Sequence, residues 1–244
     1  MNVEFSLRSI KRVLLVIWGL LVLAGLLAEG WRFVLDERTP LSRFFSLSCE
    51  QNAPTWYSSS LLLCCALQLG LIATRKQQAK AAFTVRWWVL AAAFLYISMD
   101  ETVSLHESAS TWFDFGGFLY YGWVIPASVI VAIMGVSYLP FLAHLPHRTR
   151  WQFVLAGAIY VGGAIGVEFP LGYWTDLTNS KNLIYGLIDL VQESMEILGI
   201  TLFLCALSEI LAGQSGRLQI TLMDRHHSPK FSQESAPEPM RIAS

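Results

Sequence analysis

The sequence predicts an all-α integral membrane protein, a bundle of six transmembrane helices with both termini in the cytoplasm. Of the 244 residues, 54% are hydrophobic and only 14% are charged, whereas a soluble domain carries about 25% charged residues. The apolar residues are gathered in long runs, and the mean hydropathy is +0.48. Lysine and arginine are concentrated in alternate connecting segments, as the positive-inside rule describes.

Six apolar runs are long enough to cross a bilayer, which takes roughly 20 helical residues. These runs are Val13–Ala28, Trp56–Thr74, Trp87–His106, Leu119–Ala143, Phe153–Tyr173 and Ile184–Ala212. The first run follows a basic segment and would also suit a signal peptide. Because leucine at position 26 stands where a cleavage site needs a small residue, we favour an uncleaved signal anchor.

The distribution of positive charge sets the predicted orientation. Of the 17 lysines and arginines, all but Arg32, Arg38, Arg43 and Lys181 lie before the first run, after the last, or between the second and third or fourth and fifth. This asymmetry places both termini in the cytoplasm, and we expect a bacterial-type cytoplasmic (inner) membrane.

The predicted organisation has three parts. Residues 1–12 form a cytoplasmic N-terminus, and residues 13–212 form the membrane domain, with an external loop over 31–54 that includes a short interfacial helix near Leu41–Leu47. Residues 213–244 form a polar cytoplasmic tail that we expect to be disordered. In the fifth run, Ala158, Gly162 and Gly166 are spaced by four residues, which predicts a ridge for close helix packing.

Carboxylates occur within the runs, although no lysine or arginine does. In the third run, Asp100, Ser104 and Glu107 fall within about 60° of one another on a helix. Glu101 flanks them, and His106 points away. In the sixth run, Asp189, Glu193 and Glu196 stack on one helical face through their spacing of four and three residues. The fifth run adds Glu168.

The predicted depths of these acids agree. At 1.5 Å per residue, Asp100 lies about 10 Å and Glu168 about 7 Å below the outer ends of their runs. Asp189, Glu193 and Glu196 lie about 8, 14 and 18 Å down. Three helices would therefore bring carboxylates to overlapping depths on the outer side. Simple solvation at the interface would explain Glu107 or Asp189 equally well.

Carboxylates within a membrane cost several kcal/mol, so they need a compensating arrangement. They can bind metal cations, hold protons, or line a wet cavity. For a metal, the oxygen-rich set favours Fe, Mn, Mg or Ca over zinc. We expect metal ligands at Asp100, Glu168, Asp189, Glu193 and Glu196. Glu101, His106 and Glu107 are the expected catalytic groups or proton carriers.

Short motifs carry a resemblance that covers most of the chain. They are Asn52–Ser58 leading into a run, Met99-Asp100-Glu101 with His106-Glu107, and Glu193-Ser194-Met195-Glu196-Ile197-Leu198-Gly199. This set resembles uncharacterised bacterial polytopic membrane proteins with an intramembrane DE…HE motif and a later ExxE motif, for which no activity is established. The architecture also looks similar to intramembrane hydrolases of the alkaline-ceramidase type, but the histidines that hold their zinc are absent.

Three functions remain open at this stage. The first is a metal-dependent enzyme acting on a lipid or other lipophilic substrate at the outer leaflet. The second is a non-catalytic accessory subunit of a larger membrane complex. The third is a proton or cation pathway, against which the cytoplasmic halves of the runs carry few polar residues apart from Glu209. The expected partners are membrane lipids or such a complex. The net charge of −1 gives no reason to expect nucleic acid.

Overall fold

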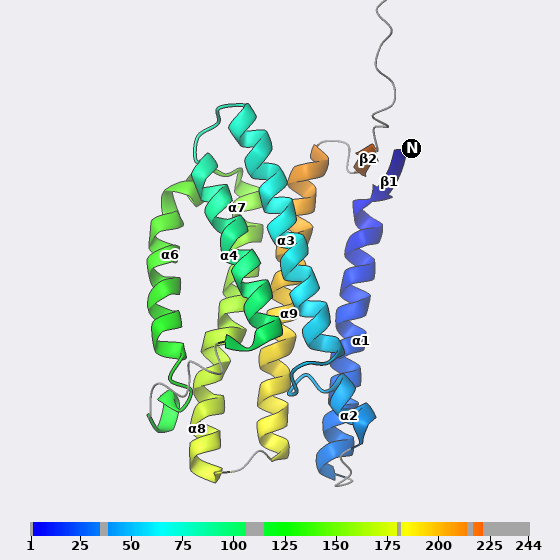
Figure 1. Ribbon diagram of the computed structural model, residues 1–244, viewed down its shortest axis with the longest axis vertical. Helices are drawn as coiled ribbons and strands as arrows, with labels where there is room; N and C mark the ends of the chain where they lie inside the picture. The colour runs from blue at the N-terminus through cyan, green and yellow to red at the C-terminus, as the bar shows by residue number, and fades with distance from the viewer. Residues whose placement is uncertain (1, 35–38, 106–114, 180–181, 214–216, 222–244) are drawn as a thin grey trace, which may run out of the picture.

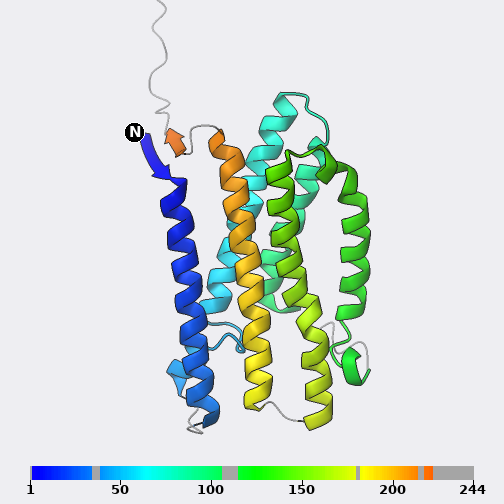
Figure 2. The same cartoon turned by 180° about the vertical axis from the view of Figure 1, so that it is seen from behind.

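The computed structural model describes residues 2–34, 39–105, 115–179, 182–213 and 217–221, and within them the chain forms an antiparallel bundle of helices (Figures 1 and 2). The elements are β1 (Asn2–Ser6), α1 (Leu7–Val34), α2 (Pro40–Phe45), α3 (Ala53–Gln78), α4 (Thr84–Val103), η1 (Gly117–Leu119), α6 (Val124–His144), α7 (His147–Val161), η2 (Gly162–Val167), α8 (Glu168–Thr178), α9 (Leu183–Ala212) and β2 (Arg217–Thr221).

Five helical segments are long and apolar enough to span a membrane. They are Leu7–Phe33, Ala53–Gln78, Val124–His144, His147–Thr178 and Leu183–Ala212. The third predicted span corresponds to α4, which lies alongside these helices (Figure 1). It is not among the five because every 18-residue stretch of this 20-residue helix includes Arg86, Asp100 and Glu101. The fold is therefore helical, with five candidate membrane spans and α4 beside them.

The two ends of the bundle differ. At one end, here called the terminal end, β1 pairs antiparallel with β2, so both ends of the described chain lie together (Figure 1). The opposite end, with α2 and η1, is called the distal end. The bounds of two elements differ from the expectations. Helix α1 begins at Leu7, within the segment predicted as the N-terminal extension, and residues 217–221 of the predicted disordered tail form a strand.

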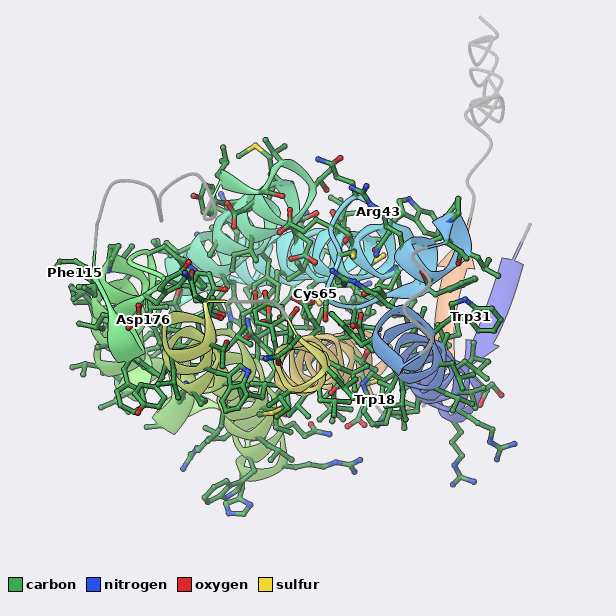
Figure 3. All side chains as sticks on the ribbon, turned by 90° about the horizontal axis from the view of Figure 1, so that it is seen from below. Trp18, Trp31, Arg43, Cys65, Phe115 and Asp176 are labelled. Carbon is green, nitrogen blue, oxygen red and sulfur yellow. The ribbon has the colours of Figure 1, made fainter. Side chains whose placement is uncertain are left out.

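Helix α9 is the centre of the bundle. It packs against α1, α3, α7, η2 and α8, and Figure 3 shows it between α1 and α8 in the view from the distal end. More than half of its most apolar stretch is buried, 56%, compared with 17% for α1 and for α6 at the two edges. The Trp18 indole of α1 donates to the Ser194 carbonyl oxygen at 2.9 Å. The acids of α9 are therefore carried by the most buried helix.

The edge helices expose apolar side chains as a membrane helix does. On α6, the side chains of Ile133, Val136 and Leu139 remain mostly exposed. A soluble fold seldom leaves so continuous an apolar face uncovered. This surface is the one expected to face lipid acyl chains.

The distal end is built from helices of unequal length. Helices α3 and α4 stop short of the distal ends of α1, α8 and α9 (Figure 1). The connection into α3 is fixed by Asn52, whose side-chain oxygen accepts from the Thr55 amide at 3.2 Å and whose amide donates to the Ser46 carbonyl at 2.6 Å. The predicted short helix near residues 41–47 is confirmed as α2. The connection after α1, which was predicted to be an external loop from residue 31, starts later because α1 continues to Val34.

The close packing of α7 and η2 against α9 depends mainly on Gly163 and Gly199, which are not in the predicted ridge. A Cβ at Gly199 would lie 2.8 Å from the Tyr160 amide nitrogen and 2.9 Å from the Ala156 carbonyl oxygen. A Cβ at Gly163 would lie 2.8 Å from the Gln192 carbonyl oxygen. From the predicted ridge, Ala158 is exposed and Gly166 has open space around it. The π-helical η2 explains the difference, because its wider turn shifts the face that a regular α-helix would present.

Candidate intramembrane acidic site

The acids of α9 interact electrostatically with acids of two other helices. Glu193 interacts with Glu196 and Asp189 on its own helix, with Glu101 of α4 and with Glu168 of α8. Glu196 interacts with the same two residues of α4 and α8. Asp189 and Glu168 are buried, whereas Glu193 and Glu196 keep part of their surface accessible. We call Glu101, Glu168, Asp189, Glu193 and Glu196 the acidic group.

Tyr160 of α7 lies next to this group. Its phenol interacts electrostatically with Glu196, Glu101 and Glu193, and also with Asp100. Asp100 thus lies close enough to sense the same tyrosine as the other acids. Tyr160 belongs to the same close contact between α7 and α9 that Gly199 permits. The sequence offered no signal for it, since a tyrosine within an apolar run is ordinary in a membrane helix.

Glu168 is held by two neutral donors. Its Oε1 accepts from the Trp123 indole at 3.3 Å, and its Oε2 accepts from the Gln192 amide at 2.6 Å. Glu168 is the first residue of α8, directly after the π-helical turn, and such turns occur frequently at functional sites. Because α8 continues to Thr178, Glu168 lies about 15 Å from the distal end of its helix, deeper than predicted. Glu193 lies at about the same depth on α9.

Gln192 leaves an acceptor without a partner. The residue is 94% buried, and its amide nitrogen is used by Glu168. Its Oε1 has no hydrogen-bond partner within the described part of the chain. The same side chain also lies close to Glu196. A buried amide oxygen among carboxylates needs a hydrogen-bond donor or a cation, because a buried acceptor without a hydrogen bond costs about 1–3 kcal/mol.

Glu101 is tied to α3. The Ser58 hydroxyl donates to Glu101 Oε1. One residue further on α3, the Ser59 hydroxyl donates to the Ser98 carbonyl oxygen at 2.7 Å. This serine pair lets α3 and α4 approach closely. The position of Glu101 is therefore set by packing between neighbouring helices, which its place in the sequence does not reveal.

Asp189 lies near two tyrosines at the distal side. Tyr121 and Tyr185 interact with each other, and both interact electrostatically with Asp189 and Glu168. The Tyr121 hydroxyl is 3.5 Å from the Thr175 hydroxyl. Burial raises the pKa of Tyr121 above its ordinary value, so this phenol stays a hydrogen-bond donor at neutral pH.

Two of the predicted site residues, His106 and Glu107, lie outside the described residues. Across the described ranges, no three Asp, Glu, His or Cys side chains stand in an arrangement that would already hold a metal ion. The acids are near enough to influence one another but not gathered as ready ligands. The metal-ligand and catalytic roles assigned to individual residues stay predictions.

Glu29 is a buried acid that the sequence interpretation missed. It is fully buried near the distal end of α1, where its Oε1 accepts from the Ser46 hydroxyl and lies 3.7 Å from the Arg32 guanidinium. A Cβ at Gly186 of α9 would lie 2.6 Å from its Oε2. The predicted first span ends at Ala28 and the predicted loop begins at residue 31, so Glu29 falls between the two. It joins α1, α2 and α9.

Cations are distributed unevenly over the described residues. Ion pairs there involve Glu29 and Glu209. Glu193 and Glu196 have no lysine or arginine partner among these residues, and their electrostatic neighbours are other acids. Because acids surround Glu193 and Glu196 there, a bound proton or cation is needed to offset their charge.

The fold and site are compatible with a multi-pass membrane protein that carries acids within its helices. A family model for a domain of unknown function, DUF8692, matches residues 14–210. The chain therefore belongs to this family. No curated protein and no solved structure matches it.

Proposed function

We propose that this protein is a membrane enzyme that uses a metal ion bound at the acidic group to act on a lipid or other lipophilic substrate. The observation that carries the proposal is the buried Oε1 of Gln192, which has no hydrogen-bond partner among the described residues and belongs to a side chain beside Glu168 and Glu196. The candidate ligands are all oxygens, and Glu193 and Glu196 have no cationic partner among the described residues. Such an environment favours a hard or intermediate metal ion.

The chemistry follows from this ligand type. Glu193, Glu196 and the Gln192 oxygen would supply oxygen ligands from one helix, and Glu168 would supply another from α8. A metal held this way would act as a Lewis acid or activate water. Glu101, anchored by Ser58, is an α4 acid that interacts electrostatically with both Glu193 and Glu196, and it would serve as a proton acceptor.

Metal analysis of the purified full-length protein tests the proposal. We expect stoichiometric Fe, Mn, Mg or Ca in the parent protein, and loss of that metal in Glu193→Gln/Glu196→Gln. The matched control is Asp176→Asn, an exposed acid at the distal end of α8 that accepts from the Gly117 amide. Absence of metal from the parent after growth in each metal would refute the enzyme proposal. Retention of metal in the double variant would place the ligands elsewhere.

A second candidate, a proton pathway, is supported by a buried polar line between α3 and α9. The Tyr57 and Thr201 hydroxyls lie near each other, and neither has a hydrogen-bond partner within the described part of the chain. Towards the terminal end, Gln68 and Ser208 exchange hydrogen bonds at 3.1 and 3.2 Å. Glu209 follows directly. The half of the bundle expected to be apolar therefore contains more buried polar groups than the sequence suggested.

Proton flux in vesicles separates the two candidates. Reconstituted parent protein that dissipates an imposed pH gradient, with the flux abolished by Thr201→Val, would favour the pathway. The control is Thr74→Val, whose hydroxyl bonds to its own helix at the Gly70 carbonyl. Metal in the parent together with an absence of flux would favour the enzyme.

A further inference from the structure

At the terminal end, away from the acidic group, the bundle contains a second site with the opposite charge. A cavity of about 550 Å³ opens between α1, α3, the α6–α7 turn and α9. Its volume falls in the range of small-molecule pockets, about 300–1,000 Å³. We propose that this cavity binds the phosphate headgroup of an anionic membrane lipid. The proposal does not depend on the function of the acidic group.

The cavity is lined by four cationic side chains and one carboxylate. They are Arg8, Lys11, Lys76, Arg148 and Glu209. Lys11 and Arg148 both pair with Glu209, at Oε1 and Oε2 respectively. Arg8 and Lys76 have no acidic partner among the described residues, so the cavity carries a surplus of positive charge. Such a surplus suits an anion with several acceptor oxygens, such as a phosphate.

Other cations at the same end are committed to the fold. Arg150 donates to the carbonyl oxygens of Leu142 and Ala143, closing the end of α6. Arg75 donates to the Leu211 carbonyl oxygen near the end of α9 at 3.3 Å. Arg8 and Lys76 differ from Arg75 and Arg150 in this respect. Among the described residues neither donates to a carbonyl oxygen at a helix end, and both side chains are exposed.

The rest of the lining is apolar. Trp87 and Leu145 are buried side chains that face the cavity from α4 and the α6–α7 turn, and Leu7 adds a third. A cationic rim over an apolar wall matches an amphiphile, whose phosphate meets the cations and whose glycerol and first acyl carbons meet the wall. A soluble phosphate compound would use the rim alone. Basic pockets between transmembrane helices bind anionic lipid headgroups in this way.

The test compares two pairs of substitutions that remove the same charge from the same end. Arg8→Gln/Lys76→Gln removes two cations of the cavity. The control, Arg12→Gln/Lys80→Gln, removes two exposed cations of α1 and the α3–α4 turn that do not line it. Binding of phosphatidylglycerol to the purified full-length protein in micelles is titrated by native mass spectrometry, with phosphatidylcholine and inorganic phosphate as separate probes.

We expect phosphatidylglycerol to bind the parent and the control pair alike, and the cavity pair at least tenfold more weakly, since each cation near an anionic lipid contributes about 1 kcal/mol. An equal loss of phosphatidylglycerol binding in both pairs of substitutions would show that the lipid is attracted by the positive charge of the whole terminal end, and would overturn the proposal. Protection of the parent against heat by inorganic phosphate to the same extent as by the lipid would assign the cavity to a soluble anion and overturn it too. Arg8→Lys/Lys76→Arg, which keeps both charges, should retain binding.

Discussion

Glu209 and the pair Glu193–Glu196 lie on the same helix but are neutralised in different ways. At the terminal end, Glu209 is shared by Lys11, Arg148 and the Gln152 amide, which donates to its Oε2 at 3.0 Å. In the distal half, Glu193 and Glu196 have acids as electrostatic neighbours and no described cation. Of these three carboxylates, Glu209 is therefore neutralised by described cations, whereas Glu193 and Glu196 call for a proton or a bound cation.

The largest expected effect on stability comes from the close contact between α7 and α9 at Gly199, which lies between Glu196 and Glu209 on α9. Gly199→Ala would place a methyl group 2.8 Å from the Tyr160 amide nitrogen, and backbone atoms there cannot move aside. We expect a loss of about 1–3 kcal/mol in stability, measured as a lower thermal midpoint in detergent.

Gly157→Ala is the matched control for that glycine. It lies on α7, and a Cβ there would meet open space. Its stability should be unchanged or raised by up to about 1 kcal/mol, because alanine favours a helix over glycine. If Gly199→Ala were equally harmless, α7 and α9 would not be held at this point.

Removing the acids of the distal half should have the next largest effect, with the opposite sign. With metal chelated, Glu193→Gln/Glu196→Gln removes repulsion between neighbouring carboxylates, worth about 1 kcal/mol or more. We expect a higher thermal midpoint than for the parent in chelator, and a smaller difference when metal is supplied. A lower midpoint under both conditions would mean that the two glutamates stabilise the fold themselves.

Glu209→Gln should destabilise the protein by about 1 kcal/mol or less. Arg148 is 78% exposed and Lys11 about a third exposed, so solvent screens both ion pairs. The loss should shrink as salt is raised from low ionic strength, because screening weakens the parent's pairs. A salt-independent loss of several kcal/mol would show that Glu209 is buried as deeply as the distal acids.

The smallest effect is expected for Asp176→Asn. Asp176 is exposed and accepts from the Gly117 amide at 2.8 Å (Figure 3). Asparagine keeps an acceptor oxygen there, so the loss should be about 0.5 kcal/mol or less. Metal content should match that of the parent. A change in metal content would extend the acidic site to the distal surface.

The sequence by itself determined the helical class and the long apolar spans, because crossing a bilayer requires apolar runs of a fixed length whatever they pack against. It also placed Asp189, Glu193 and Glu196 on one face of a helix, since helical periodicity is local. The existence of α2 followed in the same way. The sequence did not determine where helices end, and α8 continues five residues beyond the predicted end of its span.

The tertiary structure alone decided which groups meet. Three features depend on contacts between helices distant in the chain. Gln192 lies beside Glu168 with an oxygen that has no partner within the described ranges, Tyr160 lies near the acids, and Glu29 is buried against Gly186. The π-helical turn before Glu168 and the pairing of β1 with β2 are also set by packing. Periodicity describes one helix at a time, whereas the partners of a buried charge are chosen by the other helices.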